Sequence, residues 1–269
     1  MLRFILISLL LFPFLIFSQQ VNIPIDTLIK SSHSGTFNGK AVDYIAEIGN
    51  QPVWNDKGEP IATLNYTYYT SSKNDNEGKR PLLISFNGGP GSASAWMHVA
   101  YTGPKILNID EEGFPIQPYG VKSNPNSILY VTDIIYVNPV NTGYSRTIPR
   151  AGKEVKRDHF FGINADVDYL AEWLQTFVSR HNRWKSPKFL IGESYGGTRV
   201  SGLAYALQNS EWMYLNGVIM VSPADYKVFN SDTPFLRPFI FPILLLQLGI
   251  INCLITKNNR KHWKSIYLR

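Results

Sequence analysis

The chain has 269 residues, of which 44% are hydrophobic and 17% are charged, with a formal net charge of +6. Much of the positive excess lies at the C-terminal end, in Lys257, Arg260, Lys261, Lys264 and Arg269. The aromatic residues are dispersed, so the sequence lacks the basic stripe with aromatic residues that is typical of nucleic-acid binding. The single cysteine, Cys253, excludes an internal disulfide, and the scattered histidines show no metal-ligand spacing, so we expect no nucleic acid, no metal and no cofactor.

The first residues are predicted to be a signal peptide, residues 1–18. Met1-Leu2-Arg3 gives a charged start, residues 4–17 are apolar apart from Ser8, and Ser18 precedes a polar exit. Such a run is too short for a comfortable membrane span. We expect cleavage near Ser18, a secreted or periplasmic protein, and no stable membrane span afterwards. An uncleaved anchor is the alternative.

Strands and helices then alternate along the chain. Residues 42–48 and 61–69 alternate like antiparallel strands, residues 81–86 form a short apolar strand, and a Gly/Pro-rich stretch leads to an apolar run at 128–137. A helix is expected over 166–179, because five large apolar residues fall on one face (Leu170, Trp173, Leu174, Phe177 and Val178). Strand 188–192, helix 198–207 and strand 215–221 follow. This alternation predicts an α/β fold with a mostly parallel sheet and helices on both faces.

The most informative segment is Gly192-Glu193-Ser194-Tyr195-Gly196, between a predicted strand and a predicted helix. A serine at such a turn has a strained backbone, and its hydroxyl is raised above the edge of the sheet. Gly192 and Gly196 flank it because side chains at those points would collide across the turn. Ser194 is therefore the candidate nucleophile, with a purely structural turn as the alternative.

A second segment, Asn87-Gly88-Gly89-Pro90-Gly91, directly follows the strand at 81–86. A glycine-rich turn in this position brings backbone N–H groups close to a reacting atom, as an oxyanion hole requires. Alone, a plain Gly/Pro loop would be the better interpretation. Together, the glycine-rich turn and the serine turn indicate the oxyanion hole and the nucleophile of one active site.

These two segments resemble the signatures of the serine carboxypeptidases of the α/β-hydrolase fold, Asn-Gly-Gly-Pro-Gly and Gly-Glu-Ser-Tyr followed by a small residue and Gly. Residues 138–145 are a third, looser match to the family's Pro-x-Gly-x-Gly-Phe-Ser segment. The resemblance runs from about Asp43 to Asp225. It implies an α/β-hydrolase fold and a hydrolase that removes C-terminal residues from peptides through a serine acyl-enzyme.

The resemblance also implies a role for single residues. Ser194 matches the nucleophile, the backbone N–H groups of Gly89 and Tyr195 match the oxyanion donors, and Asn87 and Glu193 match the side chains that hold the peptide's free C-terminal carboxylate. Glu193 is able to bind an anion if one proton is shared between the two carboxyl groups; a solvated loop residue is the alternative. The remaining motif residues shape the turns (Gly88, Pro90, Gly91, Gly192, Gly196 and Gly197).

Three positions depart from the family's pattern. Ser92 stands where many members carry a cysteine, Asn141 replaces a usual glycine, and Val137 lies where an aspartate is common. These differences predict a divergent, bacterial-type member with an open substrate preference. Lone histidines such as His98 and His159 are interpreted as structural or exposed.

The C-terminal part does not supply a recognisable triad. In α/β-hydrolases the order is Ser, Asp, His, and only Asp225, Asp232 and His262 follow Ser194. Residues 243–255 are mostly apolar and the rest of the tail is basic. We expect residues 19–242 to be the N-terminal part of the hydrolase domain, incomplete at its C-terminus, and residues 243–269 to be an aberrant tail. A frameshift is the preferred cause and a membrane anchor the alternative.

The sequence therefore predicts a serine carboxypeptidase-like hydrolase, truncated and inactive because the catalytic Asp and His are missing. An acyltransferase on the same scaffold, or a non-catalytic remnant that binds peptide C-termini, are the alternatives. Missing strands would leave an open sheet edge and exposed apolar faces, which predicts poor solubility.

Overall fold

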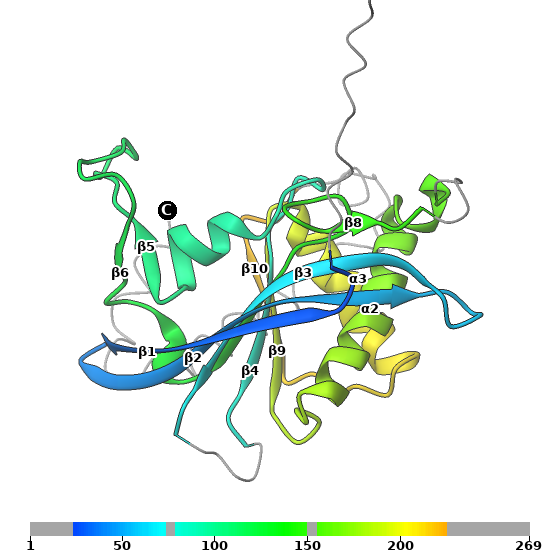
Figure 1. Ribbon diagram of the computed structural model, residues 1–269, viewed down its shortest axis with the longest axis horizontal. Coiled ribbons are helices and arrows are strands. Elements are labelled where there is room, and N and C mark those ends of the chain that lie inside the picture. The colour runs from blue at the N-terminus through cyan, green and yellow to red at the C-terminus, as the bar shows by residue number, and fades with distance from the viewer. Residues whose placement is uncertain (1–23, 74–78, 150–154, 225–269) are drawn as a thin grey trace, which may run out of the picture.

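The computed structural model describes residues 24–73, 79–149 and 155–224 (Figure 1). The predicted signal peptide, Asp225, Asp232, His262 and the tail at 243–269 lie outside these residues. In chain order the described elements are β1 (Thr27–Phe37), β2 (Lys40–Trp54), β3 (Pro60–Ser71), β4 (Leu82–Phe86), η1 (Met97–Thr102), β5 (Lys105–Leu107), β6 (Val121–Ser123), η2 (Ile128–Tyr130), β7 (Asp133–Val137), β8 (Arg146–Thr147), η3 (Arg157–His159), α2 (Ile163–Arg180), β9 (Lys188–Glu193), α3 (Tyr195–Asn209) and β10 (Gly217–Val221).

The main sheet has the strand order β1-β2-β3-β7-β4-β9-β10, and β8 pairs with β3. Strands β7, β4, β9 and β10 are parallel, whereas β1, β2 and β3 extend this parallel part by antiparallel pairing. Every residue of β4 and β7 is buried, as expected for parallel strands that are covered on both faces. The predicted α/β architecture is confirmed.

Helices cover both faces of the sheet. On one face, α2 and α3 pack against each other and against the sheet, and the predicted apolar stripe of α2 is buried (Leu170, Trp173, Leu174, Phe177 and Val178). On the other face, Met97 of η1 and Leu129 of η2 pack on side chains of β4, β7 and β9. Figure 1 shows α2 and α3 on one side of the sheet, and β5 and β6 on the other. Among the described residues, no helix is long and apolar enough to cross a membrane.

Several elements differ from the sequence-based expectation. Strand β1 was not expected, because its residues are mostly polar and exposed; it is held by backbone pairing with β2 along its whole length. The stretch expected to be a Gly/Pro-rich loop contains η1 and the β5–β6 hairpin. The apolar run at 128–137 is divided between two elements, because the Ser127 hydroxyl accepts from Leu129 N and caps the short helix η2 before β7 begins.

A buried charged cluster lies at the start of the parallel strands. Asp133, the first residue of β7, is paired with both Arg80 and Arg183. The Arg183 guanidinium also donates to the backbone carbonyls of Arg80 (2.7 Å) and Pro81 (3.4 Å). These bonds fix the chain that enters β4, at the end of the sheet opposite to the candidate site.

Candidate active site

The predicted site residues meet at the carboxyl ends of two neighbouring parallel strands. Phe86, the last residue of β4, is in register with Gly192 of β9, so Asn87 and Ser194 follow at the same edge of the sheet. In open parallel sheets this edge is where ligands bind. The two motifs, far apart in the sequence, therefore form one site.

Ser194 has the backbone geometry that its motif predicts. Its dihedral angles are φ 56° and ψ −121°, and positive φ is costly for a residue with a side chain, about 1–3 kcal/mol. The turn is held by Ser194 N donating to Val221 O at 2.9 Å. A Cβ at Gly192 would lie 2.0 Å from the carbonyl oxygen of Gly196, so the glycine is required by the close approach across the turn.

The glycine-rich loop at 87–91 lies directly against this turn. A Cβ at Gly88 would be 2.6 Å from Tyr195 N and 2.7 Å from Glu193 O. Gly89 has φ 109°, a value that residues with side chains rarely adopt. At Gly91, in contrast, a Cβ would meet nothing within 4 Å. The loop and the serine turn thus bring the backbone of Gly89 and Tyr195 to the same part of the site.

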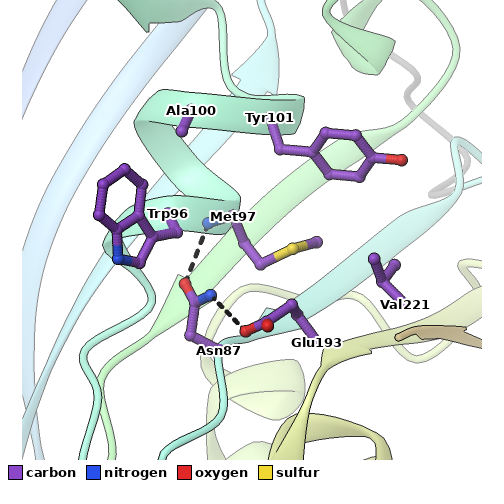
Figure 2. A pocket seen from close by; sticks show the side chains of 7 residues that line it. All are labelled: Asn87, Trp96, Met97, Ala100, Tyr101, Glu193 and Val221. Carbon is purple, nitrogen blue, oxygen red and sulfur yellow. Dashed lines mark hydrogen bonds between the residues drawn. The ribbon is translucent and has the colours of Figure 1, made fainter. Parts of the chain in front are cut away.

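Asn87 and Glu193 face each other (Figure 2), and Glu193 directly precedes Ser194 in the chain. The Asn87 side-chain amide donates from Nδ2 to Glu193 Oε2 at 3.1 Å, while its Oδ1 accepts from Met97 N at 2.9 Å. Asn87 is only 1% exposed. Because Oδ1 is occupied, the amide is held with its NH₂ group toward the carboxylate. The structure therefore brings together the two side chains that the resemblance assigned to carboxylate binding.

The pair lies at one end of a pocket of about 400 Å³. The other lining residues are mainly apolar: Trp96, Met97, Ala100 and Tyr101 come from η1 or its start, and Val221 ends β10 (Figure 2). Trp96 and Tyr101 are 64% and 55% exposed. Sequence reasoning missed this wall, although the apolar residues between Gly91 and Gly103 were a signal for a helix.

Helix η1 is held against strands β3 and β7 by a hydrogen-bond network. His98 Nε2 bonds the Tyr69 hydroxyl at 2.7 Å, and its ring stacks on Tyr136 with centroids 4.5 Å apart. Thr102 Oγ1 bonds the Tyr136 hydroxyl at 2.7 Å and donates to Met97 O at 2.9 Å. Burial lowers the pKa of His98 to about 4, so the imidazole is neutral near pH 7 and serves to anchor the pocket wall.

The other histidines in the described part of the chain are also engaged away from the serine. His181 Nε2 bonds Glu47 at 2.8 Å, His33 bonds Ser31, and His159 packs on Phe160. Within residues 24–73, 79–149 and 155–224, no histidine is hydrogen-bonded to Ser194, and no group of three or more His, Cys, Asp or Glu could hold a metal ion.

The third matching segment supports the loop at 87–91. Asn138 Oδ1 accepts from Ser94 N at 2.9 Å, and the Ser94 hydroxyl donates to Val137 O. Asn141 has φ 60°, and asparagine is among the residues that best tolerate this left-handed region. The backbone at Asn141 therefore has a conformation that a glycine would also adopt, which fits the expected replacement of a glycine at this position.

The parallel sheet, the strained serine between β9 and α3, and the loop after β4 define an α/β-hydrolase. A model of the serine carboxypeptidase family matches residues 57–233, more than half of the chain, and the chain belongs to this family.

Two curated relatives and one solved structure illustrate the match. The vitellogenic carboxypeptidase of Aedes aegypti is 32% identical over 148 residues, 54% of this chain and 28% of the relative. Serine carboxypeptidase-like 8 of Arabidopsis thaliana is 28% identical over 197 residues, 68% and 42% of the two chains. A prohormone-processing carboxypeptidase from Saccharomyces cerevisiae shares the fold with a TM-score of 0.55 at 18% identity, covering 83% of this chain and 45% of that one. The chain thus spans less than half the length of these relatives.

Proposed function

We propose that the described residues form the nucleophile-bearing and carboxylate-binding part of a serine carboxypeptidase that acts on peptide C-termini. The observation that carries this proposal is the Asn87–Glu193 hydrogen bond of 3.1 Å beside Ser194. An amide and a carboxylate held together at the end of an apolar pocket are suited to a ligand that ends in a carboxyl group. A general esterase has no need of such a pair.

In the proposed reaction, Ser194 Oγ attacks the carbonyl carbon of the last peptide bond. The carbonyl oxygen becomes an oxyanion that accepts hydrogen bonds from the N–H groups of Gly89 and Tyr195. The C–N bond then breaks, the C-terminal amino acid leaves with a proton on its amine, and water hydrolyses the acyl-serine.

We place the base that takes the serine proton outside the described residues, because the four described histidines lie in other contacts. Without a base, a serine hydroxyl keeps only its weak intrinsic reactivity, and oxyanion donors alone give modest residual catalysis. Slow reaction of Ser194 is therefore the expectation for a chain in which no base reaches it.

Carboxylate binding is proposed to use one proton shared between Glu193 and the substrate. The Asn87 amide donates to this pair, and the proton removes the repulsion between the two carboxyl groups. Affinity for a peptide with a free C-terminus should therefore fall as the pH rises.

The pocket also indicates a substrate class. Trp96, Met97 and Tyr101 present a broad apolar wall beside the Asn87–Glu193 pair. A C-terminal residue with an aromatic or large aliphatic side chain would bury its apolar surface there. We propose this preference over small or charged C-terminal residues.

The test uses a fluorophosphonate probe and a blocked dipeptide that ends in phenylalanine. Labelling that is absent in S194A, together with release of free phenylalanine, supports the carboxypeptidase. Labelling with release only when an acceptor alcohol is present supports an acyltransferase instead. The same dipeptide as its C-terminal amide is the control, and equal turnover of acid and amide would overturn the role of Asn87 and Glu193.

A second candidate is a non-catalytic domain that binds peptide C-termini. It is favoured by the intact Asn87–Glu193 pair combined with the engagement of all four described histidines elsewhere. Absence of labelling, with binding of the free acid but not of the amide, would establish it.

We further propose export by a signal peptide at residues 1–18, with a hydrolase domain over residues 19–242 and a bacterial-type place within the family. Mass spectrometry of the exported protein tests the first point, since cleavage near Ser18 would give a new N-terminus. Retention of Met1 to Ser18 in the mature protein would contradict it.

A further inference from the structure

Arg199 is a buried arginine that the motifs do not account for. It lies in α3 and is 1% exposed. Its Nε donates to Asp166 Oδ2 at 2.8 Å, its Nη1 to the backbone carbonyl of Asn87 at 2.8 Å, and its Nη2 to that of Pro90 at 3.3 Å. One guanidinium thus connects α2, α3 and the loop at 87–91.

The two carbonyls that Arg199 holds lie on either side of Gly89. The intervening backbone consists of Gly88 and Gly89, and Gly89 has φ 109°. Glycine gives a loop access to many conformations. A loop with two adjacent glycines therefore needs contacts from outside the loop to hold it in a single conformation. Arg199 supplies such a contact at each end of the segment that carries the proposed oxyanion N–H.

Arg199 also contacts the other half of the site. Its guanidinium carbon lies 5.1 Å from the centre of the Tyr195 ring, and Tyr195 N is the second proposed oxyanion donor. A Cβ at Gly196 would approach Asn87 O at 3.1 Å, so the helix start and the loop already touch. The Arg199 side chain therefore contacts both segments that carry a proposed oxyanion donor, the loop with Gly89 and the helix start with Tyr195.

Asp166 orients the guanidinium and is itself held. It lies in the first turn of α2. The Tyr169 hydroxyl is 3.4 Å from Asp166 Oδ1 and accepts from Val140 N at 3.1 Å. These contacts extend the network to the third matching segment. A buried charge needs such pairing, because an unpaired one is strongly destabilising.

We propose that Arg199 is a positioning residue that fixes the loop at 87–91 relative to Ser194, with Asp166 as its orienting partner. The catalytic consequence rests on the proposed function of Ser194, whereas the holding of the loop does not. Only a planar group with several fixed donors reaches one carboxylate and two carbonyls at once, so lysine should not replace it.

The chain contains a matched control in Arg183. This buried arginine also pairs with an aspartate, Asp133, and also donates to two backbone carbonyls, those of Arg80 and Pro81. It lies at the other end of the parallel strands. Loss of Arg183 should therefore destabilise the protein in a similar way without affecting the loop at 87–91.

The experiment compares R199K, R199M and R183M with the parent by hydrogen exchange, thermal unfolding and fluorophosphonate labelling, well below each melting temperature. Exchange of the amides at 88–97 should be at least about 10-fold faster in R199K and R199M, and labelling of Ser194 about 10- to 100-fold slower, since small misplacements of reacting groups cost rates of this size. R183M should lower the melting temperature but leave the exchange rate at 88–97 and the labelling rate of Ser194 unchanged. Where R199M does not fold, R199K supplies the comparison.

Unchanged exchange at 88–97 in folded R199K or R199M would overturn the proposal, as would an equal increase in R183M. If the parent is not labelled at all while R199K exchanges faster at 88–97, the proposed catalytic function fails and the positioning of the loop stands. If the loop exchanges faster but labelling keeps the parental rate, the link from Arg199 to the chemistry is refuted.

Discussion

Acidification should destabilise the protein through His98, because the neutral side chain of this η1 residue is packed between η1 and strands β3 and β7. Its pKa is lowered from the usual 6.5 to about 4 by burial. Between these two values the unfolded chain binds a proton that the folded chain does not, so stability rises with pH in this window and is lost as the pH falls. For one such group, the free energy of unfolding changes by about 1.4 kcal/mol for each pH unit within the window.

The expected size follows from these two values. Between pH 7 and pH 5 the folded state should lose about 2 kcal/mol, and about 3 kcal/mol by pH 4. Glu47 acts in a lower window. Its hydrogen bonds to His181 and Tyr66 outweigh burial and lower its pKa from 4.5 to about 2, so its contribution is present above pH 4.5 and is lost below it. The two groups are thus separable by pH.

Urea unfolding at pH 7, 6 and 5 measures this effect in the parent and in H98Q. Glutamine retains a group able to bond the Tyr69 hydroxyl but does not titrate. H98Q should be less stable than the parent at pH 7 through lost stacking on Tyr136, yet should lose less than about 1 kcal/mol between pH 7 and pH 5. An unchanged loss of about 2 kcal/mol in H98Q would refute the assignment to His98.

Three further predictions concern the site itself. S194G should keep or raise the free energy of unfolding, by up to about 1 kcal/mol, since glycine relieves the positive φ; a clear loss in a urea titration would contradict the strained turn. G88A should destabilise by about 1–3 kcal/mol because its Cβ would lie 2.6 Å from Tyr195 N, whereas G91A, with open space around it, should melt within a degree or two of the parent; equal effects would refute this packing. E193Q should bind the free-acid dipeptide with an affinity nearly independent of pH, measured calorimetrically from pH 5 to 7, and a parental pH dependence would exclude the shared proton.

The serine turn was predictable because its requirements are local. Gly192 is needed by its close approach to Gly196 four residues later, and the flanking strand and helix each have their own apolar pattern. Gly196, in contrast, approaches the carbonyl oxygens of Phe86 and Asn87, so its requirement appears only once the neighbouring loop is in place. The apolar stripe of α2 was predictable for the same reason. Strand β1 was not, since its polar residues are ordered by pairing with β2 and not by burial.

Arg199 could not be found from the sequence because its burial depends on three separate segments. In isolation, an arginine in a helix is typical of a solvated face. Here its partners are Asp166, Asn87 and Pro90, which become neighbours only when α2, α3 and β4 assemble. The pocket wall was missed for a related reason. The π-helical turn of η1 has only six residues, too few for a period to be recognised, and it is stabilised by His98 and Thr102 against β3 and β7.

Glu193 and His98 should give the same pocket two opposing responses to pH. The proposed proton shared by Glu193 and the substrate carboxylate makes peptide binding stronger as the pH falls. The cost of protonating His98 within η1 makes the wall of the same pocket less stable as the pH falls over the same range, from 6.5 toward 4. Binding of the free-acid dipeptide should therefore rise on mild acidification and then decline as the folded fraction is lost. In H98Q the decline should move to lower pH while the rise is retained, because Glu193 is unaltered. A decline at the same pH in both proteins would show that another group limits the acid side, and would separate the stability of η1 from the chemistry of the carboxylate site.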